Sequence, residues 1–102
     1  MIKNMVLSTI RTGNKDLGDN IMKIYGINGR KNIAGSRIKA IRERNGWSQA
    51  DLAAKLQVEN VVVEQKAISR IERGERLIAD YELFAFSKVL KVSMEWLVSG
   101  KM

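Results

Sequence analysis

Apolar residues recur at helical spacing from Ile33 onward. In the segment IAGSRIKAIRERNG, Ala34, Ile38 and Ile41 lie three or four residues apart, which predicts a helix with one buried face. Gly46 follows at the position where a left-handed residue commonly caps a helix. The pattern therefore predicts a first helix that begins near residue 33 and ends before residue 46.

The next segment, WSQADLAAKL, carries a helix start signal. Ser48 and Asp51 have the Ser-x-x-Asp spacing of a capping box, ahead of the apolar Leu52 and Leu56. A second helix is therefore expected here. The run QVENVVVE then breaks the helical period, and we interpret it as a loop or an extended link because β-branched residues disfavour helices. The alternative is that its valines prolong one of the neighbouring helices.

Three more helices are predicted in the remainder of the chain. The first covers residues 65–73 and ends at Gly74, and the last begins at Ser93 and ends at Gly100. Between them a helix starts near Asp80, a predicted N-cap, and its apolar side comprises Leu83, Phe86, Val89 and Leu90. Five short helices without an alternating strand pattern predict a compact all-α domain.

The helix over residues 65–73 has two chemically different faces. Its polar face spans an arc of roughly 140° at about 3.6 residues per turn, and it contains Gln65, Lys66, Ser69, Arg70 and Arg73. The opposite face contains Ala67, Ile68 and Ile71. Amide, cationic and hydroxyl groups are the ones that bond base edges in the major groove of DNA, although such a face can also be merely solvated. A capped helix, a link and this second helix together form a helix-turn-helix arrangement, which favours DNA binding.

The overall charge supports a nucleic-acid partner. The 102 residues have a formal net charge of +7 and an isoelectric point near 10.0. The chain contains no cysteine and no histidine, which excludes disulfides, thiolate nucleophiles, imidazole bases and zinc sites built from these residues. Asp51, Glu72 and Glu75 share no face at a spacing suited to hydrolysis. We therefore expect no enzyme activity, no metal and no cofactor.

The segment before Ile33 differs from the rest of the chain. Residues 1–32 hold six basic and two acidic residues and have weak periodicity, so we divide the chain into an N-terminal arm, 1–32, and a helical domain, 33–102. The arm is either partly disordered or forms a short helix with Leu17, Ile21, Ile24 and Tyr25 on one side. No signal peptide, no membrane-spanning segment and no further domain after Met102 are expected, which predicts a cytoplasmic protein.

Three motifs together, RIKAIRERNGWSQADLAAKL, AISRIERGER and LKVSMEWLVSG, resemble the Cro/repressor-type helix-turn-helix regulators, the XRE family. The resemblance covers about residues 33–100 and implies a lambda-repressor-like fold. Glu72 lies between the two faces of its helix and needs a positive partner, and the resemblance implies an ion pair with Arg42. It also implies phosphate contacts and base contacts; the phosphate-contact residues are Ser48, Gln49, Arg73 and Arg76, and the base-contact residues are Gln65, Lys66, Ser69 and Arg70.

Two features depart from the family pattern. The link between Leu56 and Ile68 is longer than in the compact phage repressors, and Glu64 occupies the position where a better N-cap is expected. The arm has no counterpart in the family pattern.

These observations predict a sequence-specific DNA-binding transcriptional regulator. We expect a repressor that binds a near-palindromic operator on double-stranded DNA as a homodimer, because one recognition helix alone buries little surface. The dimer surface is expected on the fourth and fifth helices or on the arm. The alternative is a protein-interaction module with a protein partner, such as an antitoxin or an adaptor.

Overall fold

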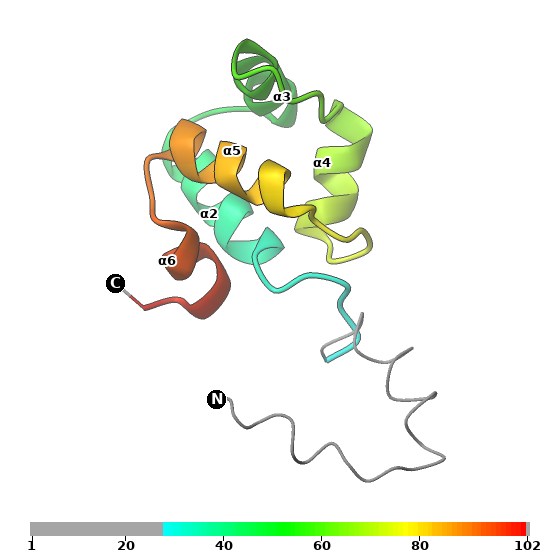
Figure 1. The fold of residues 1–102 in the computed structure, drawn as a ribbon. Helices are drawn as coiled ribbons and strands as arrows, with labels where there is room; N and C mark the ends of the chain where they lie inside the picture. The colour runs from blue at the N-terminus through cyan, green and yellow to red at the C-terminus, as the bar shows by residue number, and fades with distance from the viewer. Residues whose placement is uncertain (1–27, 102) are drawn as a thin grey trace, which may run out of the picture.

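The computed structural model describes residues 28–101, and the regular structure of this part of the chain is helical (Figure 1). This confirms the all-α prediction and the five predicted helices within the described residues. The helix predicted from Leu17 to Tyr25, and its disordered alternative, lie outside the described residues. The helices are α2 (Gly35–Arg44), α3 (Gln49–Val58), α4 (Gln65–Glu72), α5 (Asp80–Leu90) and α6 (Met94–Ser99).

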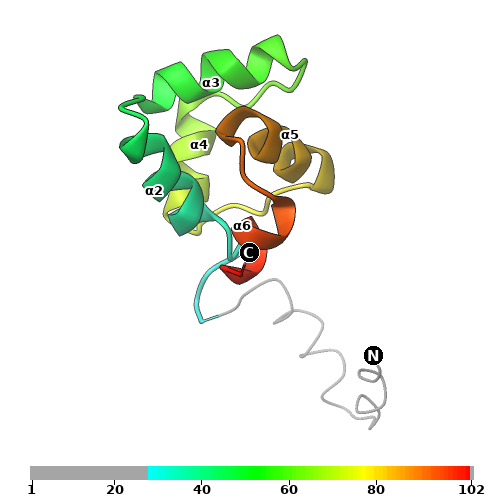
Figure 2. The same ribbon diagram turned by 90° about the vertical axis from the view of Figure 1, so that its left-hand side faces the viewer.

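One apolar core joins the helices. Helix α3 packs against α4 and α5, α2 packs against the same two helices, and α6 packs against α5 (Figure 2). Helix α4 is therefore supported by α2 and α3 while it lies at the edge of the molecule (Figure 1). The buried apolar residues are Ala34, Ile38, Ile41, Leu52, Leu56, Val63, Ile68, Ile71, Ala85, Phe86, Leu90 and Leu97.

Helix α3 is longer than the sequence pattern predicted. Gln57 and Val58, which we assigned to the link, are its last two residues. The helical penalty of a single valine is below about 0.7 kcal/mol, which is too small to end a helix that is already packed. The helix ends instead at a turn in which Asn60 has a positive φ of 65° and donates its N–H to the carbonyl of Gln57 at 2.9 Å. Only residues 61–64 form the link.

Helix α5 starts at Asp80, near which it was predicted to start, but its N-cap differs from the prediction. Asp80 is the first residue of the helix, and Ala79 is the N-cap. The cap interaction comes from Glu82, whose Oε1 accepts the Ala79 N–H at 3.0 Å. The prediction was wrong because it looked for a capping side chain at the N-cap itself, whereas an acidic residue in the first turn binds the N-cap backbone here.

The last residues before α2 contact the end of α4. Asn32 donates from Nδ2 to the carbonyls of Ile71 and Arg76, at 3.0 and 2.8 Å, and Arg30 donates to the carbonyl of Glu72 at 3.1 Å. The carbonyls of Ile71 and Glu72 are among those that a helix C-terminus leaves without intrahelical donors, and the carbonyl of Arg76 belongs to the loop that follows. The approach is so close that a Cβ on Gly35 would lie 2.0 Å from the Ile71 carbonyl oxygen, which requires glycine there.

No helix within residues 28–101 has the length and apolar character needed to cross a membrane.

Candidate nucleic-acid interface

Helix α4 separates a buried apolar side from an exposed polar side. Ile68 and Ile71 are inaccessible to solvent. Gln65, Lys66 and Arg70 are exposed on the other side, and Ser69, which lies one turn after Gln65, is half-buried. The four residues that the resemblance assigns to base contacts therefore lie on one polar surface, which we call the α4 polar face. Glu64 is the N-cap of α4 but makes no side-chain capping bond.

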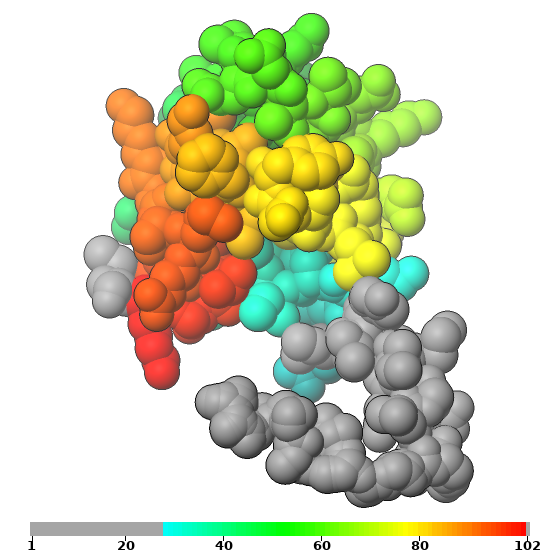
Figure 3. All heavy atoms as spheres, viewed as in Figure 1, coloured from blue at the N-terminus to red at the C-terminus, as the bar shows by residue number. Residues whose placement is uncertain are grey.

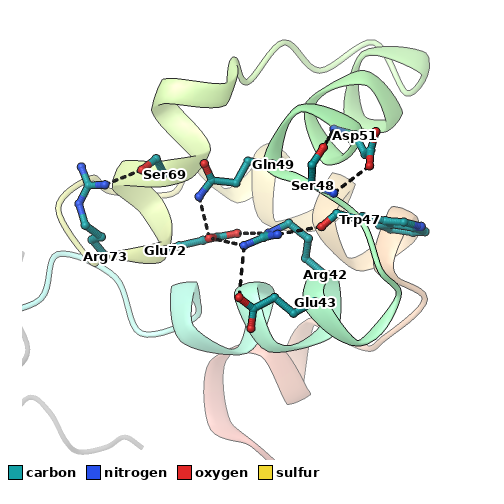
Figure 4. Close-up of polar contacts among 9 residues, drawn as sticks. All are labelled: Arg42, Glu43, Trp47, Ser48, Gln49, Asp51, Ser69, Glu72 and Arg73. Carbon is teal, nitrogen blue, oxygen red and sulfur yellow. Dashed lines mark hydrogen bonds and ion pairs between the residues drawn. The ribbon is translucent and has the colours of Figure 1, made fainter.

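The carboxylate of Glu72 lies inside the domain, beneath the α4 polar face. Only 3% of its side chain is exposed, and the Arg42 side chain is 10% exposed. Arg42 donates from Nε to Oε2 at 2.7 Å and from Nη2 to Oε1 at 3.1 Å (Figure 4). Arg42 also donates to the carbonyl of Trp47 at 2.8 Å, and Gln49 donates from Nε2 to Oε1 of Glu72 at 3.0 Å. The network joins α2, the start of α3 and α4.

This network removes a negative charge from the surface that would meet DNA. The hydrogen bond to Glu72 raises the pKa of the Arg42 guanidinium, and this buried cation offsets the negative charge of the carboxylate. An unpaired carboxylate beside the α4 polar face would repel phosphate. Gln49 also gains a fixed orientation, because its amide bonds Glu72 while its backbone begins α3.

The N-terminus of α3 has the predicted capping box. Ser48 Oγ accepts the Asp51 N–H at 2.9 Å, and the Ser48 N–H donates to Oδ2 of Asp51 at 2.8 Å. The bond from the Ser48 N–H to the carboxylate is the main cause that lowers the pKa of the Asp51 carboxyl group. Gln49 and Ala50 occupy the first turn, where helix geometry leaves backbone N–H groups without intrahelical acceptors. Such groups are suited to an anion.

Arg73 follows α4 and is exposed, but it has acidic and hydroxyl partners. Its guanidinium donates to both carboxylate oxygens of Glu75, each at 3.1 Å, and to Ser69 Oγ. The pairing raises the pKa of Arg73 and lowers the pKa of Glu75. More than half of each side chain is solvent-accessible, so a phosphate can exchange with Glu75 at small cost.

Arg76, which the resemblance assigns to a phosphate contact, has an acidic partner within the domain. It donates to both carboxylate oxygens of Glu82 at 2.9 Å and to the carbonyl of Leu77 at 3.0 Å. Glu82 is buried, and its hydrogen bonds with Arg76 and the Ala79 N–H lower the pKa of its carboxyl group. Arg76 thus fixes the loop between α4 and α5, a role that sequence reasoning missed.

Three residues that position α4 were not identified from the sequence. Arg30 and Asn32 bind the carbonyls at the end of α4, and Glu82 orders the loop that follows it. A local signal existed only for Glu82, which lies three residues after Ala79, the N-cap of α5, as in a capping box. The contacts of Arg30 and Asn32 join positions about forty residues apart, so no local pattern reveals them.

A capped helix, an ordered link and a second helix with an exposed polar face define a helix-turn-helix DNA-binding domain. The family model described as Helix-turn-helix matches residues 38–97. The chain therefore belongs to this family, the Cro/repressor-type (XRE) helix-turn-helix regulators, and is a DNA-binding transcriptional regulator. No curated protein and no solved structure was found to match the chain.

Proposed function

We propose that the protein is a repressor that binds a near-palindromic DNA operator as a homodimer, with α4 in the major groove. The α4 polar face carries this proposal, because it combines exposed amide, cationic and hydroxyl groups on a helix whose opposite side is fixed in the core. Arg70 and Lys66 have the chemistry to bond guanine, Gln65 to bond adenine, and Ser69 to bond either.

Phosphate contacts on both sides of α4 would set its register in the groove. Ser48 and Gln49 lie at the N-terminus of α3, where the helix dipole and its free N–H groups favour an anion. Arg73 is exposed beyond the other end of α4. Arg76 is half-buried, so we assign it an indirect part: through Glu82 it holds the loop that carries Arg73.

We place the dimer surface on α5. Tyr81 and Phe84 lie one turn apart on this helix and are 63% and 54% exposed. Helix α5 crosses the face of the molecule drawn in Figure 3 and is uncovered by other described elements there. Large aromatic side chains contribute strongly when two surfaces associate. A two-fold dimer would present two α4 helices to successive major grooves, about 34 Å apart.

Selection from a randomised duplex library with the purified full chain, at near-physiological salt, tests the proposal. An enriched inverted repeat with half-sites about one helical turn apart is the expected result. A reporter gene under a promoter that overlaps this sequence should then be expressed less when the protein is present. Enrichment of a single half-site would contradict the dimer, and increased reporter expression would contradict repression.

The exposed aromatic pair on α5 also suits a second candidate, a protein-interaction module such as an antitoxin or an adaptor. In that case the chain would bind a protein partner in a salt-independent manner, and the library would show no sequence enrichment. A loss of partner binding in Phe84→Glu, together with an absence of DNA selection, would favour this candidate.

A further inference from the structure

In the link between α3 and α4, residues 61–64, the side chain of one valine, Val62, is exposed to solvent. In this extended segment Val63 is buried and Val61 is partly buried against the core, whereas Val62 is 70% exposed. Successive side chains of an extended chain point to opposite sides. Because Val61 and Val63 both face the core, the side chain of Val62 is directed into solvent.

The backbone on either side of Val62 is fixed. The Val61 N–H donates to the carbonyl of Leu56 at 3.1 Å, and the carbonyl of Glu64 accepts the N–H of Ile68 at 2.9 Å. Val62 therefore lies on a short ordered segment between two helices, and its side chain has a defined position relative to α4.

Val62 lies against the α4 polar face. It lines one depression with Gln57 and Gln65, between α3 and the start of α4. It also lines a second depression with Lys66 and Arg70. The valine is thus an apolar neighbour of Gln65, Lys66 and Arg70, three of the four base-contact candidates on the α4 polar face.

The chemistry of this position matches one group in the major groove. The C5-methyl of thymine is the apolar group that base pairs present there, and apolar side chains bind it by contact. The neighbouring amide and cations suit purine edges, but they cannot distinguish thymine by its methyl. We propose that Val62 contacts the C5-methyl of a thymine next to the bases bound by Gln65 and Lys66, and so determines part of the operator sequence. This inference depends on the proposed function.

Replacement of single thymines by deoxyuridine tests the contact directly, because it removes only the methyl. Affinity of the full chain for its selected operator should fall about fourfold for each half-site at one symmetric position, as expected for one lost methyl contact. In Val62→Ala the same replacement should have little effect. Val58→Ala removes another exposed valine, from the end of α3, and should keep the wild-type response.

Each outcome bears on the inference. The Val62 contact would be overturned if the chain binds a specific sequence but no deoxyuridine replacement lowers its affinity. It would also be overturned if such a replacement lowers the affinity of Val62→Ala as much as that of the wild type. Either result would leave the proposed function intact. Failure of the wild-type chain to select any duplex would overturn the proposed function and this inference together.

Discussion

Replacement of Glu72 by alanine should destabilise the protein strongly. The change leaves the guanidinium of Arg42, whose side chain is 10% exposed, without the carboxylate that accepts two of its hydrogen bonds, and it also removes the acceptor for Gln49. Breaking a buried ion pair on one side costs about 3–5 kcal/mol. A domain of about 70 residues has a free energy of unfolding of roughly 4–10 kcal/mol, so a large part of its stability should disappear.

Urea denaturation followed by circular dichroism measures this change. In a domain of this size, each kcal/mol lost from the free energy of unfolding lowers Tm by about 4–8 °C, so a thermal scan of Glu72→Ala should show a Tm at least about 12 °C below that of the wild type. Glu72→Gln, which keeps the shape and one acceptor, is the milder variant if the alanine variant does not fold. Glu75→Ala removes an exposed carboxylate that also pairs with an arginine, and it is the matched control with a much smaller expected effect.

A double variant separates the stranded charge from the loss of packing. Arg42→Met combined with Glu72→Met removes both charges and should be considerably more stable than Glu72→Ala alone. The reasoning is refuted if Glu72→Ala destabilises no more than Glu75→Ala, since the cation would then be well solvated without its partner.

Three further outcomes are expected from the same structure. The pKa of the Glu82 carboxyl group lies below its ordinary value of 4.5. The ionised carboxylate therefore stabilises the fold above that value, and this stabilisation is lost as the pH falls through the lowered pKa. Urea denaturation between about pH 3 and pH 7 should show that acid reduces the free energy of unfolding less steeply in Glu82→Gln than in the wild type. If the proposed homodimer forms through α5, Phe84→Glu should sediment as a monomer at a concentration where the wild type sediments as a dimer, with unchanged circular dichroism; a variant that is still a dimer would exclude α5 as the interface. Asn32→Ala should destabilise by roughly 1–3 kcal/mol, because the carbonyls of Ile71 and Arg76 lose a donor, and equal urea midpoints for variant and wild type would show that water replaces the amide.

Local sequence signals predicted the helices well where capping and periodicity agreed. Ser48 and Asp51 marked the start of α3, and the turns of α2 and α4 carry Gly46 and Gly74 with positive φ of 76° and 79°. These signals can be recognised in the sequence because a cap or a left-handed turn is determined by interactions among residues a few positions apart. The two faces of α4 were predictable for the same reason.

The supports of α4 depend on contacts between distant parts of the chain. Nothing near Asn32 indicates that its amide reaches carbonyls beyond residue 70, and nothing near Arg76 distinguishes a phosphate contact from a bond to Glu82. Likewise, the sequence of three adjacent valines in the link does not show which side chains face the core and which faces solvent, because only the packing of Val63 decides this. Long-range packing, and not local preference, determines these features.

The base preference of an Arg70 variant is the most direct test of the proposal that the α4 polar face contacts bases. Arg70 is exposed beside Lys66, whereas Lys39 is an exposed cation on α2. Library selection with Arg70→Ala should lose the preference at one position in each half-site and keep the preferences elsewhere, and Lys39→Ala should select the same sequence as the wild type. If the sequence selected by Arg70→Ala is identical at every position to the wild-type sequence, Arg70 does not read a base, and the assignment of the α4 polar face is contradicted.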